Sequence, residues 1–139
     1  MEHFTFNYPV RLDDLDYMGI IGNSHWLVIL ERARIDMLEK IDFPFSKMMK
    51  LKIGGVVAEA TIKFQKPATF GDQLTVAISP HDPFKYGGFL KYDIHNQQGA
   101  PCLFADLKMI FVNSEGKPTT IPPEISDRLF ATYTNMESI

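Results

Sequence analysis

Three carboxylates lie close together near the start of the chain, Asp13, Asp14 and Asp16, and form its densest acidic cluster. Carboxylates at this spacing can bind a cation or take part in proton transfer and nucleophilic attack. The run D-L-D-Y-M-G matches the first half of an EF-hand calcium loop, but Met18 stands where an oxygen ligand belongs and His25 where a bidentate glutamate is needed. The pattern therefore excludes a calcium loop of this kind.

Other side chains that could do chemistry have no partners at a useful spacing. Ser24 lies in the run G-N-S-H-W, which resembles a nucleophile elbow, but Trp26 replaces the second glycine and the chain is too short for the usual hydrolase sheet. The four histidines, His3, His25, His81 and His95, have neither the paired spacing on a helix nor the accompanying C-x-x-C motif that a metal site would need. We therefore expect no serine nucleophile and no metal site.

The acidic cluster comes just before an expected helix start, where Asn23 or Ser24 can serve as the N-cap. The first N–H groups of a helix have no internal partners, and the helix dipole favours negative charge beside them. A thioester carbonyl docked on these groups would be polarised, and a nearby carboxylate could attack it or activate a water against it. A plainer interpretation is that the acids only solvate the loop and stabilise the helix N-terminus. Composition leaves both interpretations open.

The hydrophobic period predicts the scaffold that positions these residues. Residues 4–10 alternate as in a half-buried strand, and residues 25–41, which lack Pro and Gly, are typical of a largely buried helix. Four more alternating segments follow, at residues 56–64, 74–78, 90–94 and 103–111. The first of these segments is expected to place five residues on one face: Val56, Ala58, Ala60, Ile62 and Phe64.

The connections between these strands decide the fold class. They are too short for parallel crossovers, so the last four strands must be antiparallel neighbours or nearly so. We therefore expect an α+β fold, in which one central helix packs on one face of a curved five-stranded antiparallel sheet. Residues 122–133 are expected to form a short final helix, because proline suits a helix start.

Composition limits the class of protein further. A chain of 139 residues with 45% hydrophobic residues fits one domain, which we place at residues 1–139. The net charge of −3 argues against binding nucleic acid or an anionic membrane surface. Cys102 is the only cysteine, so no intrachain disulfide can form, and neither a targeting segment nor a membrane span is visible. We expect a cytoplasmic protein.

Two blocks of sequence resemble a known family. Residues 11–34 read RLDDLDYMGIIGNSHWLVILERAR, and they resemble the signature of the 4-hydroxybenzoyl-CoA thioesterase family of hotdog-fold proteins. In that family an Arg and a D-x-D-x-x-G segment precede the central helix, which carries an aromatic residue and an E-x-A-R run. Residues 56–72, VVAEATIKFQKPATFGD, are similar to the family's second strand and its Pro-Ala…Gly-Asp turn. The resemblance implies a hotdog fold and hydrolysis of acyl-CoA thioesters.

The resemblance also implies which residues act. Asp16 matches the family's nucleophile or general base, Asn23 matches the helix-start position whose backbone N–H holds the thioester carbonyl, and Gly19 matches the motif's glycine. In the family the residue between the two acids is usually small and polar, and here it is Leu15. Ile20, Ile21 and Gly22 replace a stretch that is often His-Val-Asn or carries an aromatic residue. The loss of polar groups beside Asp16 implies a more apolar pocket wall, which disfavours polar or aromatic acyl groups.

The expected ligand is an acyl thioester of coenzyme A or of an acyl carrier. Lys85 resembles the place where relatives put basic residues for the coenzyme A phosphates, and Lys66 and Lys91 are alternatives. No cofactor is expected, because coenzyme A belongs to the substrate. Glu31 and Arg34 can pair along the helix and are expected to be structural, while Glu59 is a reserve catalytic acid.

The resemblance also implies an oligomeric assembly, and two alternative functions remain open. It implies a homodimer or a homotetramer, and an open edge strand on a monomer would favour aggregation. One alternative function is a hotdog hydroxyacyl dehydratase, for which His25 is the nearest candidate. The other is a non-catalytic protein that binds acyl-CoA or an acyl carrier.

Overall fold

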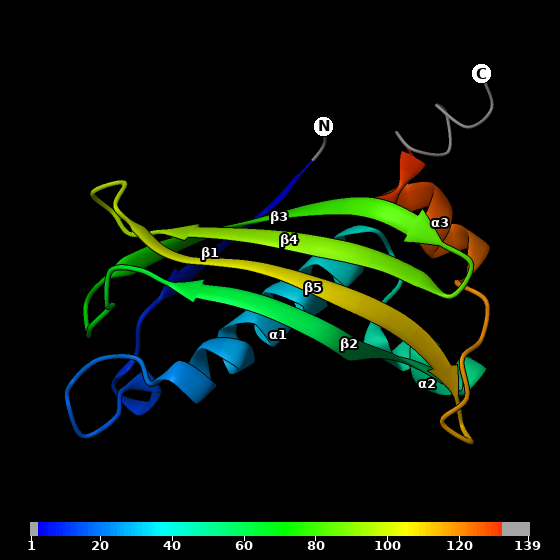
Figure 1. Cartoon of the computed structure of the whole chain (residues 1–139), viewed down its shortest axis with the longest axis horizontal. Helices are drawn as coiled ribbons and strands as arrows, with labels where there is room; N and C mark the ends of the chain where they lie inside the picture. Colours follow the sequence, from blue (N-terminus) through cyan, green and yellow to red (C-terminus); the bar gives the residue numbers. More distant parts are fainter. Residues whose placement is uncertain (1–2, 132–139) are drawn as a thin grey trace.

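The computed structural model describes residues 3–131 and contains one five-stranded sheet with three α-helices around it (Figure 1). The elements in chain order are β1 (Phe4–Pro9), the 3-10 turn η1 (Leu12–Asp14), α1 (Asn23–Lys40), α2 (Phe45–Leu51), β2 (Ile53–Phe64), β3 (Gln73–Phe84), β4 (Gly87–His95), β5 (Pro101–Asn113) and α3 (Pro123–Leu129). The strands lie in the order β1-β3-β4-β5-β2, and every neighbouring pair is antiparallel. The α+β fold predicted from the sequence is confirmed.

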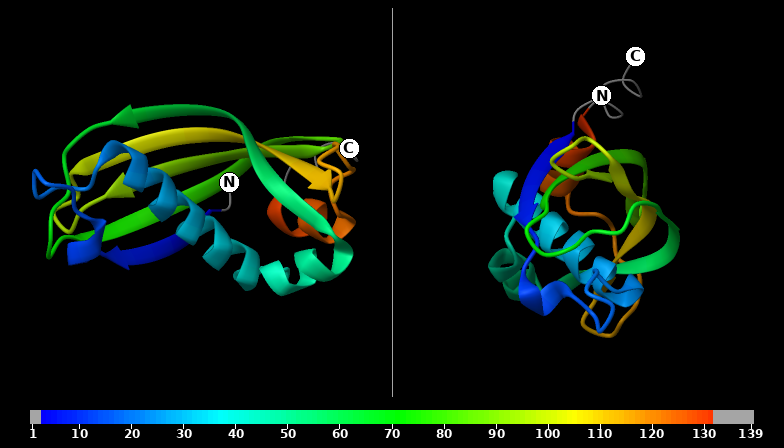
Figure 2. Two further views of the ribbon diagram at one scale, coloured as in Figure 1. Left: turned by 90° about the horizontal axis from the view of Figure 1, so that it is seen from below. Right: turned by 90° about the vertical axis from the view of Figure 1, so that its left-hand side faces the viewer.

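The sheet curves around α1, which lies against its concave face (Figure 2). The helix buries the stripe formed by Trp26, Ile29, Leu30, Ala33 and Met37. Burial of these side chains against the sheet removes apolar area from water, which stabilises the fold by roughly 25 cal/mol per Å². The predicted central helix is therefore the core element of the fold. Within residues 3–131, no helix is long and apolar enough to cross a membrane.

Strand β2 departs from the expected alternation because its register against β5 shifts between Val57 and Glu59. Val57 pairs with Met109 and Ala60 pairs with Leu107, and both β5 residues are buried. Paired residues of antiparallel strands share a face. The inner face of β2 therefore carries Val57, and the expectation of Val56 on that face is wrong because a bulge at Ala58 adds one residue.

The sequence patterns also missed one helix and misplaced one cap. Helix α2 begins after Pro44 and ends at Leu51, and its C-cap Lys52 has a left-handed φ of 56°. Its seven residues are too few to show a helical period. Helix α1 has Gly22 as its N-cap, so the expected cap at Asn23 or Ser24 is wrong. The final helix lies within the expected range, whose residues from 132 onward fall outside the described part of the chain.

Strand β2 lies at one edge of the sheet and is exposed along most of its length. Val56 and Val57 are each 43% exposed, and Phe64 is 47% exposed. A long apolar edge strand is a surface that other chains can join by strand pairing. The fold thus has an incompletely covered side, formed by β2 and by the flank of α1 next to it.

Candidate active site

The loop between β1 and α1 holds Asp16 in a tight turn. The N–H of Asp16 donates to the carbonyl of Ile20 at 2.9 Å, and the N–H of Gly19 donates to the carbonyl of Asp16 at 3.0 Å. Gly19 has a φ of 77°, a conformation that side chains other than glycine adopt only with strain. The N–H of Met18 donates to Oδ1 of Asp16 at 2.8 Å, so the turn also orients the carboxylate.

The turn brings Asp16 to the start of α1. A Cβ placed on Gly22 would lie 3.4 Å from Oδ2 of Asp16, so the absence of a side chain at the N-cap leaves room for the carboxylate. No side chain caps this helix, and the N–H groups of Asn23 and Ser24 have no acceptor among the described residues. Free helix N–H groups and a carboxylate thus lie within one small region, where they can act on the same carbonyl group.

A second segment of the chain supports this loop. The hydroxyl of Thr69 donates to the carbonyl of Gly19 at 2.7 Å, and the N–H of Ile21 donates to the carbonyl of Ala68 at 2.9 Å. Thr69 and Ala68 belong to the turn between β2 and β3. The two sequence blocks that carried the family resemblance are therefore in direct contact, and together they fix the position of the site.

The basic residues expected for coenzyme A lie in different places. Lys66 follows β2 and lies near the turn that holds Ile21, at the same end of the molecule as Asp16. Lys85 lies in the β3–β4 turn at the other end of the sheet (Figure 1), beside the ring of Tyr86. Lys91 lies over Phe104 on the outward face of the sheet. Of these three lysines, Lys66 is the one at the end of the fold that contains Asp16.

Asp14 forms a buried polar cluster that sequence reasoning missed. Its carboxylate is 2% exposed and accepts hydrogen bonds from the Tyr8 hydroxyl and the Arg11 N–H, each at 2.8 Å. Nε2 of His25 lies 2.6 Å from Oδ1 of Asp14, and Arg32 contacts both this carboxylate and the hydroxyl of Tyr8. The seven-residue spacing of His25 and Arg32, which places both on one face of α1, is the signal that could have revealed the cluster.

The environment of Asp14 shifts its ionisation. Burial alone would raise the pKa of Asp14, but the hydrogen bonds from Arg11, His25 and Tyr8 outweigh it and hold the pKa below its usual value. Burial and the neighbouring carboxylate raise the pKa of Tyr8. Asp14 is therefore a structural anion on the β1 side of α1, whereas Asp16 is exposed at the helix start.

The remaining candidates lie away from Asp16. Glu31 and Arg34 form no ion pair with each other in the described part of the chain, and Nη1 of Arg34 donates to the buried hydroxyl of Tyr92 at 3.3 Å. Both line a pocket along the second half of α1. Glu59 is exposed and forms an ion pair with Lys108 on the outer face of the sheet, away from α1.

Comparisons with known proteins identify the family of this chain. The family model of the thioesterase-like superfamily matches residues 10–129. The protein named "Putative acyl-CoA thioesterase YneP" from Bacillus subtilis is 30% identical over 110 residues, which are 76% of this chain and 77% of that protein. A protein named "Putative esterase" from Aquifex aeolicus is 25% identical over 126 residues, 91% of this chain and 97% of that protein.

A solved structure shows the same fold. A 1,4-dihydroxy-2-naphthoyl-CoA thioesterase from Synechocystis superposes with a TM-score of 0.85, at 19% identity, over 93% of this chain and 96% of that chain. The chain therefore belongs to the thioesterase-like superfamily and has the hotdog fold. It is a thioester hydrolase by this membership.

Proposed function

We propose that this protein is an acyl-CoA thioesterase in which Asp16 is the catalytic carboxylate and the N-terminus of α1 is the oxyanion site. The observation that carries the proposal is the position of Asp16 beside Gly22, next to the free N–H groups of Asn23 and Ser24. Gly19 supports it by closing the turn that orients the carboxylate. The name of the Bacillus subtilis relative supports acyl-CoA as the substrate class.

The reaction follows from this arrangement. The thioester carbonyl oxygen accepts hydrogen bonds from the N–H groups of Asn23 and Ser24, which stabilise the negative charge that develops there. Asp16 either attacks the carbonyl carbon or removes a proton from a water that attacks it. The carbon–sulfur bond then breaks, and the thiolate leaves and is protonated to coenzyme A. When Asp16 acts as general base, the acyl group carries the oxygen of the attacking water and leaves as a carboxylate. When Asp16 is the nucleophile, the acyl group remains bonded to it as a mixed anhydride, which a water then hydrolyses to the free carboxylate and Asp16.

Water labelled with heavy oxygen separates the two roles of Asp16. In a single turnover with enzyme in excess, general-base catalysis transfers the label directly into the released acid. Nucleophilic attack instead gives the first product molecule an unlabelled oxygen from Asp16 when water then attacks the aspartyl carbon, and the label remains on the protein. Mass spectrometry of both the acid and the protein reads the outcome.

Binding of coenzyme A in this proposal relies on basic side chains for its phosphates. Lys66 has the best position, because it lies at the same end of the subunit as Asp16. Lys85, in the β3–β4 turn at the other end of the sheet, and Lys91, on the outward face of β4, would serve a site in a partner subunit. No cofactor takes part in the proposed reaction.

A homodimer, or a tetramer of two dimers, completes the proposal. The exposed edge strand β2 supports this assembly, because pairing of two such strands would satisfy their free backbone groups and cover Val57 and Phe64. Leu27 on α1 is 46% exposed beside this edge and would be covered with it. A single domain at residues 1–139 remains our assignment of the chain's organisation.

The dehydratase alternative requires a histidine that moves a proton at the substrate. His25 is held on the β1 side of α1 by the buried Asp14, which Arg32 also contacts. These contacts support a structural role for His25 instead. The non-catalytic alternative predicts binding of acyl-CoA without turnover. Neither alternative accounts for a carboxylate oriented at a free helix N-terminus.

Release of free thiol from a panel of acyl-CoA esters tests the function. The proposal predicts thiol release with an equal amount of free acid, measured by a thiol reagent and by mass spectrometry. Hydration of an enoyl-CoA without thiol release would favour the dehydratase. Saturable binding of acyl-CoA with no release of thiol from any ester would favour the binding protein.

A further inference from the structure

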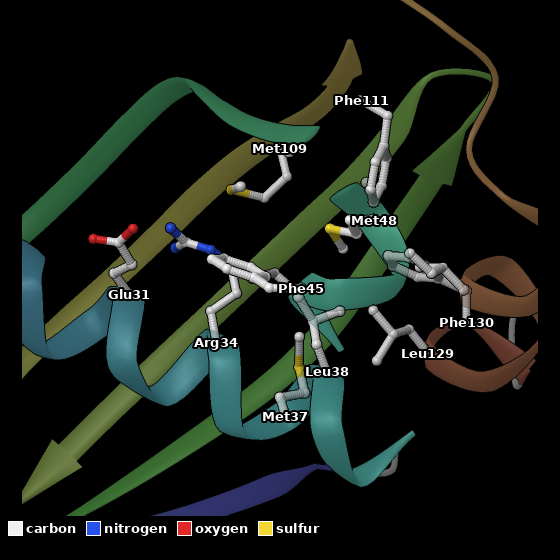
Figure 3. A pocket seen from close by; sticks show the side chains of 14 residues that line it. Glu31, Arg34, Met37, Leu38, Phe45, Met48, Met109, Phe111, Leu129 and Phe130 are labelled. Atoms are coloured by element: carbon white, nitrogen blue, oxygen red, sulfur yellow. The ribbon is translucent and has the colours of Figure 1, made fainter. Parts of the chain in front are cut away.

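An apolar pocket of about 590 Å³, counting the space at its open mouth, lies along the second half of α1. All three α-helices and strands β2, β4 and β5 contribute to its wall (Figure 3). We propose that this pocket binds the tail of a linear aliphatic acyl chain whose thioester is directed toward the N-terminus of α1. This inference rests on the proposed thioesterase function and specifies the substrate that the site selects.

The chemistry of the lining favours a hydrocarbon chain. Met37, Met48 and Met109, from three different elements, surround the cavity, and methionine side chains adapt readily to flexible apolar ligands. The charged residues of the lining, Glu31 and Arg34, lie together on one side of the pocket (Figure 3). A hydroxylated aromatic acyl group that reached past Glu31 and Arg34 would leave its hydroxyl without a hydrogen-bond partner among the apolar side chains of the lining.

The far wall of the pocket depends on a glycine. A Cβ on Gly88 would lie 2.4 Å from the ring of Phe130, so the ring can occupy its buried position only because residue 88 lacks a side chain. Phe130, together with Ile125 and Leu129, brings the C-terminal helix region over the end of the cavity. The pocket is thus closed by packing at this end.

A stripe along α1 connects the helix start to the pocket. Asn23, Leu27, Glu31 and Arg34 are spaced by four, four and three residues, so they lie on one flank of the helix. Leu27 is 46% exposed on this flank, and Val57 on the inner face of β2 is 43% exposed, so each offers apolar surface to a chain that runs along the helix. Glu31 lies about 12 Å along the helix from Asn23, at 1.5 Å per residue. Only a medium or long chain would reach from one to the other.

Two adjacent glycines offer a matched pair of variants. A Cβ on Gly55, which lines the pocket, would make ordinary contacts with Met109 at 3.7 Å and Phe111 at 3.9 Å, so a leucine there would extend into the cavity. Gly54 points to the opposite face of the strand, since successive side chains alternate, and a Cβ there would meet nothing within 4 Å. Gly55→Leu therefore fills the pocket, and Gly54→Leu makes the same chemical change outside it.

Steady-state hydrolysis of butanoyl-, octanoyl- and dodecanoyl-CoA tests the proposal. We expect kcat/KM of the wild type to increase with chain length and to exceed that for 1,4-dihydroxy-2-naphthoyl-CoA. Gly55→Leu should lower kcat/KM for dodecanoyl-CoA by roughly tenfold or more beyond its effect on butanoyl-CoA, whereas Gly54→Leu should show no such dependence on chain length. A loss that is equal for all chain lengths in Gly55→Leu, or a wild-type preference for the aromatic ester, would overturn the proposal.

Folding and binding controls keep the result interpretable. If thermal melting shows that Gly55→Leu does not fold, Leu129→Phe narrows the pocket from α3 and must reproduce the same chain-length dependence. Binding of the non-hydrolysable dodecyl thioether of coenzyme A, measured by calorimetry, separates this inference from the proposed catalysis. If the wild type binds the thioether but hydrolyses no ester, and Gly55→Leu weakens that binding, the catalytic proposal is overturned and the pocket proposal stands. If the wild type hydrolyses esters of all chain lengths equally well, the pocket proposal is overturned and the catalytic proposal stands.

Discussion

At the scale of single residues, two aspartates only two positions apart have opposite environments. Asp14 is buried and holds hydrogen bonds from Tyr8, Arg11 and His25, whereas Asp16 is exposed beside the start of α1. The sequence grouped them in one acidic cluster, because a carboxylate's burial depends on the tertiary contacts of β1 and α1. The position of Asp16 before a helix start could be predicted, and the structural role of Asp14 could not.

The first prediction concerns Asp14→Asn, which removes the anion from the buried cluster. We expect it to lower the free energy of unfolding by about 1–3 kcal/mol, because His25 and Arg32 lose a charged partner in a buried site. Asp13→Asn, at an exposed neighbouring side chain, should leave the denaturation midpoint close to that of the wild type. Urea denaturation of the three proteins measures the difference, and equal midpoints for Asp14→Asn and the wild type would contradict the assignment.

The stability contributed by Asp14 also has a defined dependence on pH. The folded pKa of Asp14 lies below its unfolded value, so the unfolded state takes up a proton first as the pH falls. The contribution is complete above the unfolded pKa, near 4, and is lost as the pH falls through the folded pKa. The stability difference between the wild type and Asp14→Asn should therefore shrink below about pH 4.

At the scale of elements, the helix start and the bulge in β2 set the geometry that local patterns missed. The N-cap of α1 is Gly22, although the next two residues, Asn23 and Ser24, are of types that usually serve as N-caps. A glycine fits here because Asp16 fills the adjacent space. The bulge between Val57 and Glu59 changed which residues face the helix, since alternation alone assumes an unbroken register. The fold class and the antiparallel strands could be predicted because they depend on hydrophobic period and connection length.

Gly22→Val tests the role of that cap. The backbone at Gly22, with φ of −69° and ψ of 152°, is extended and suits a β-branched residue, but the new methyl groups would displace the Asp16 carboxylate. We expect kcat to fall by at least about tenfold while the melting temperature changes little. A variant with wild-type kcat would show that the proximity of Asp16 to the helix start is unimportant for the reaction.

At the scale of the whole molecule, the exposed side formed by β2 and the flank of α1 is where the proposed assembly would affect the proposed reaction. The stripe from Asn23 to Arg34 and the inner face of β2 both border this side. A partner that pairs with β2 would cover apolar residues and exclude water from the region next to Asp16, which strengthens electrostatic stabilisation there. The expectation of a homodimer or homotetramer follows from this open edge.

Val57→Lys should weaken that assembly, because it places a charge among the apolar residues of the inner face of β2. Light scattering should report a dimer or a tetramer for the wild type and a lower mass for the variant at the same concentration. Lys63→Arg, on the outer face of the same strand, retains its charge and serves as the control. A monomeric wild type would contradict the proposed assembly.

The measurement that tests the central claim most directly is the turnover number of Asp16→Asn for the best acyl-CoA substrate, with Asp13→Asn as the matched control. The asparagine keeps the shape of the side chain and can accept the hydrogen bond from Met18, but it can neither attack nor accept a proton. We predict that kcat falls by at least about a hundredfold in Asp16→Asn, with normal folding, and stays near the wild-type value in Asp13→Asn. A kcat for Asp16→Asn within a few-fold of wild type would contradict the account.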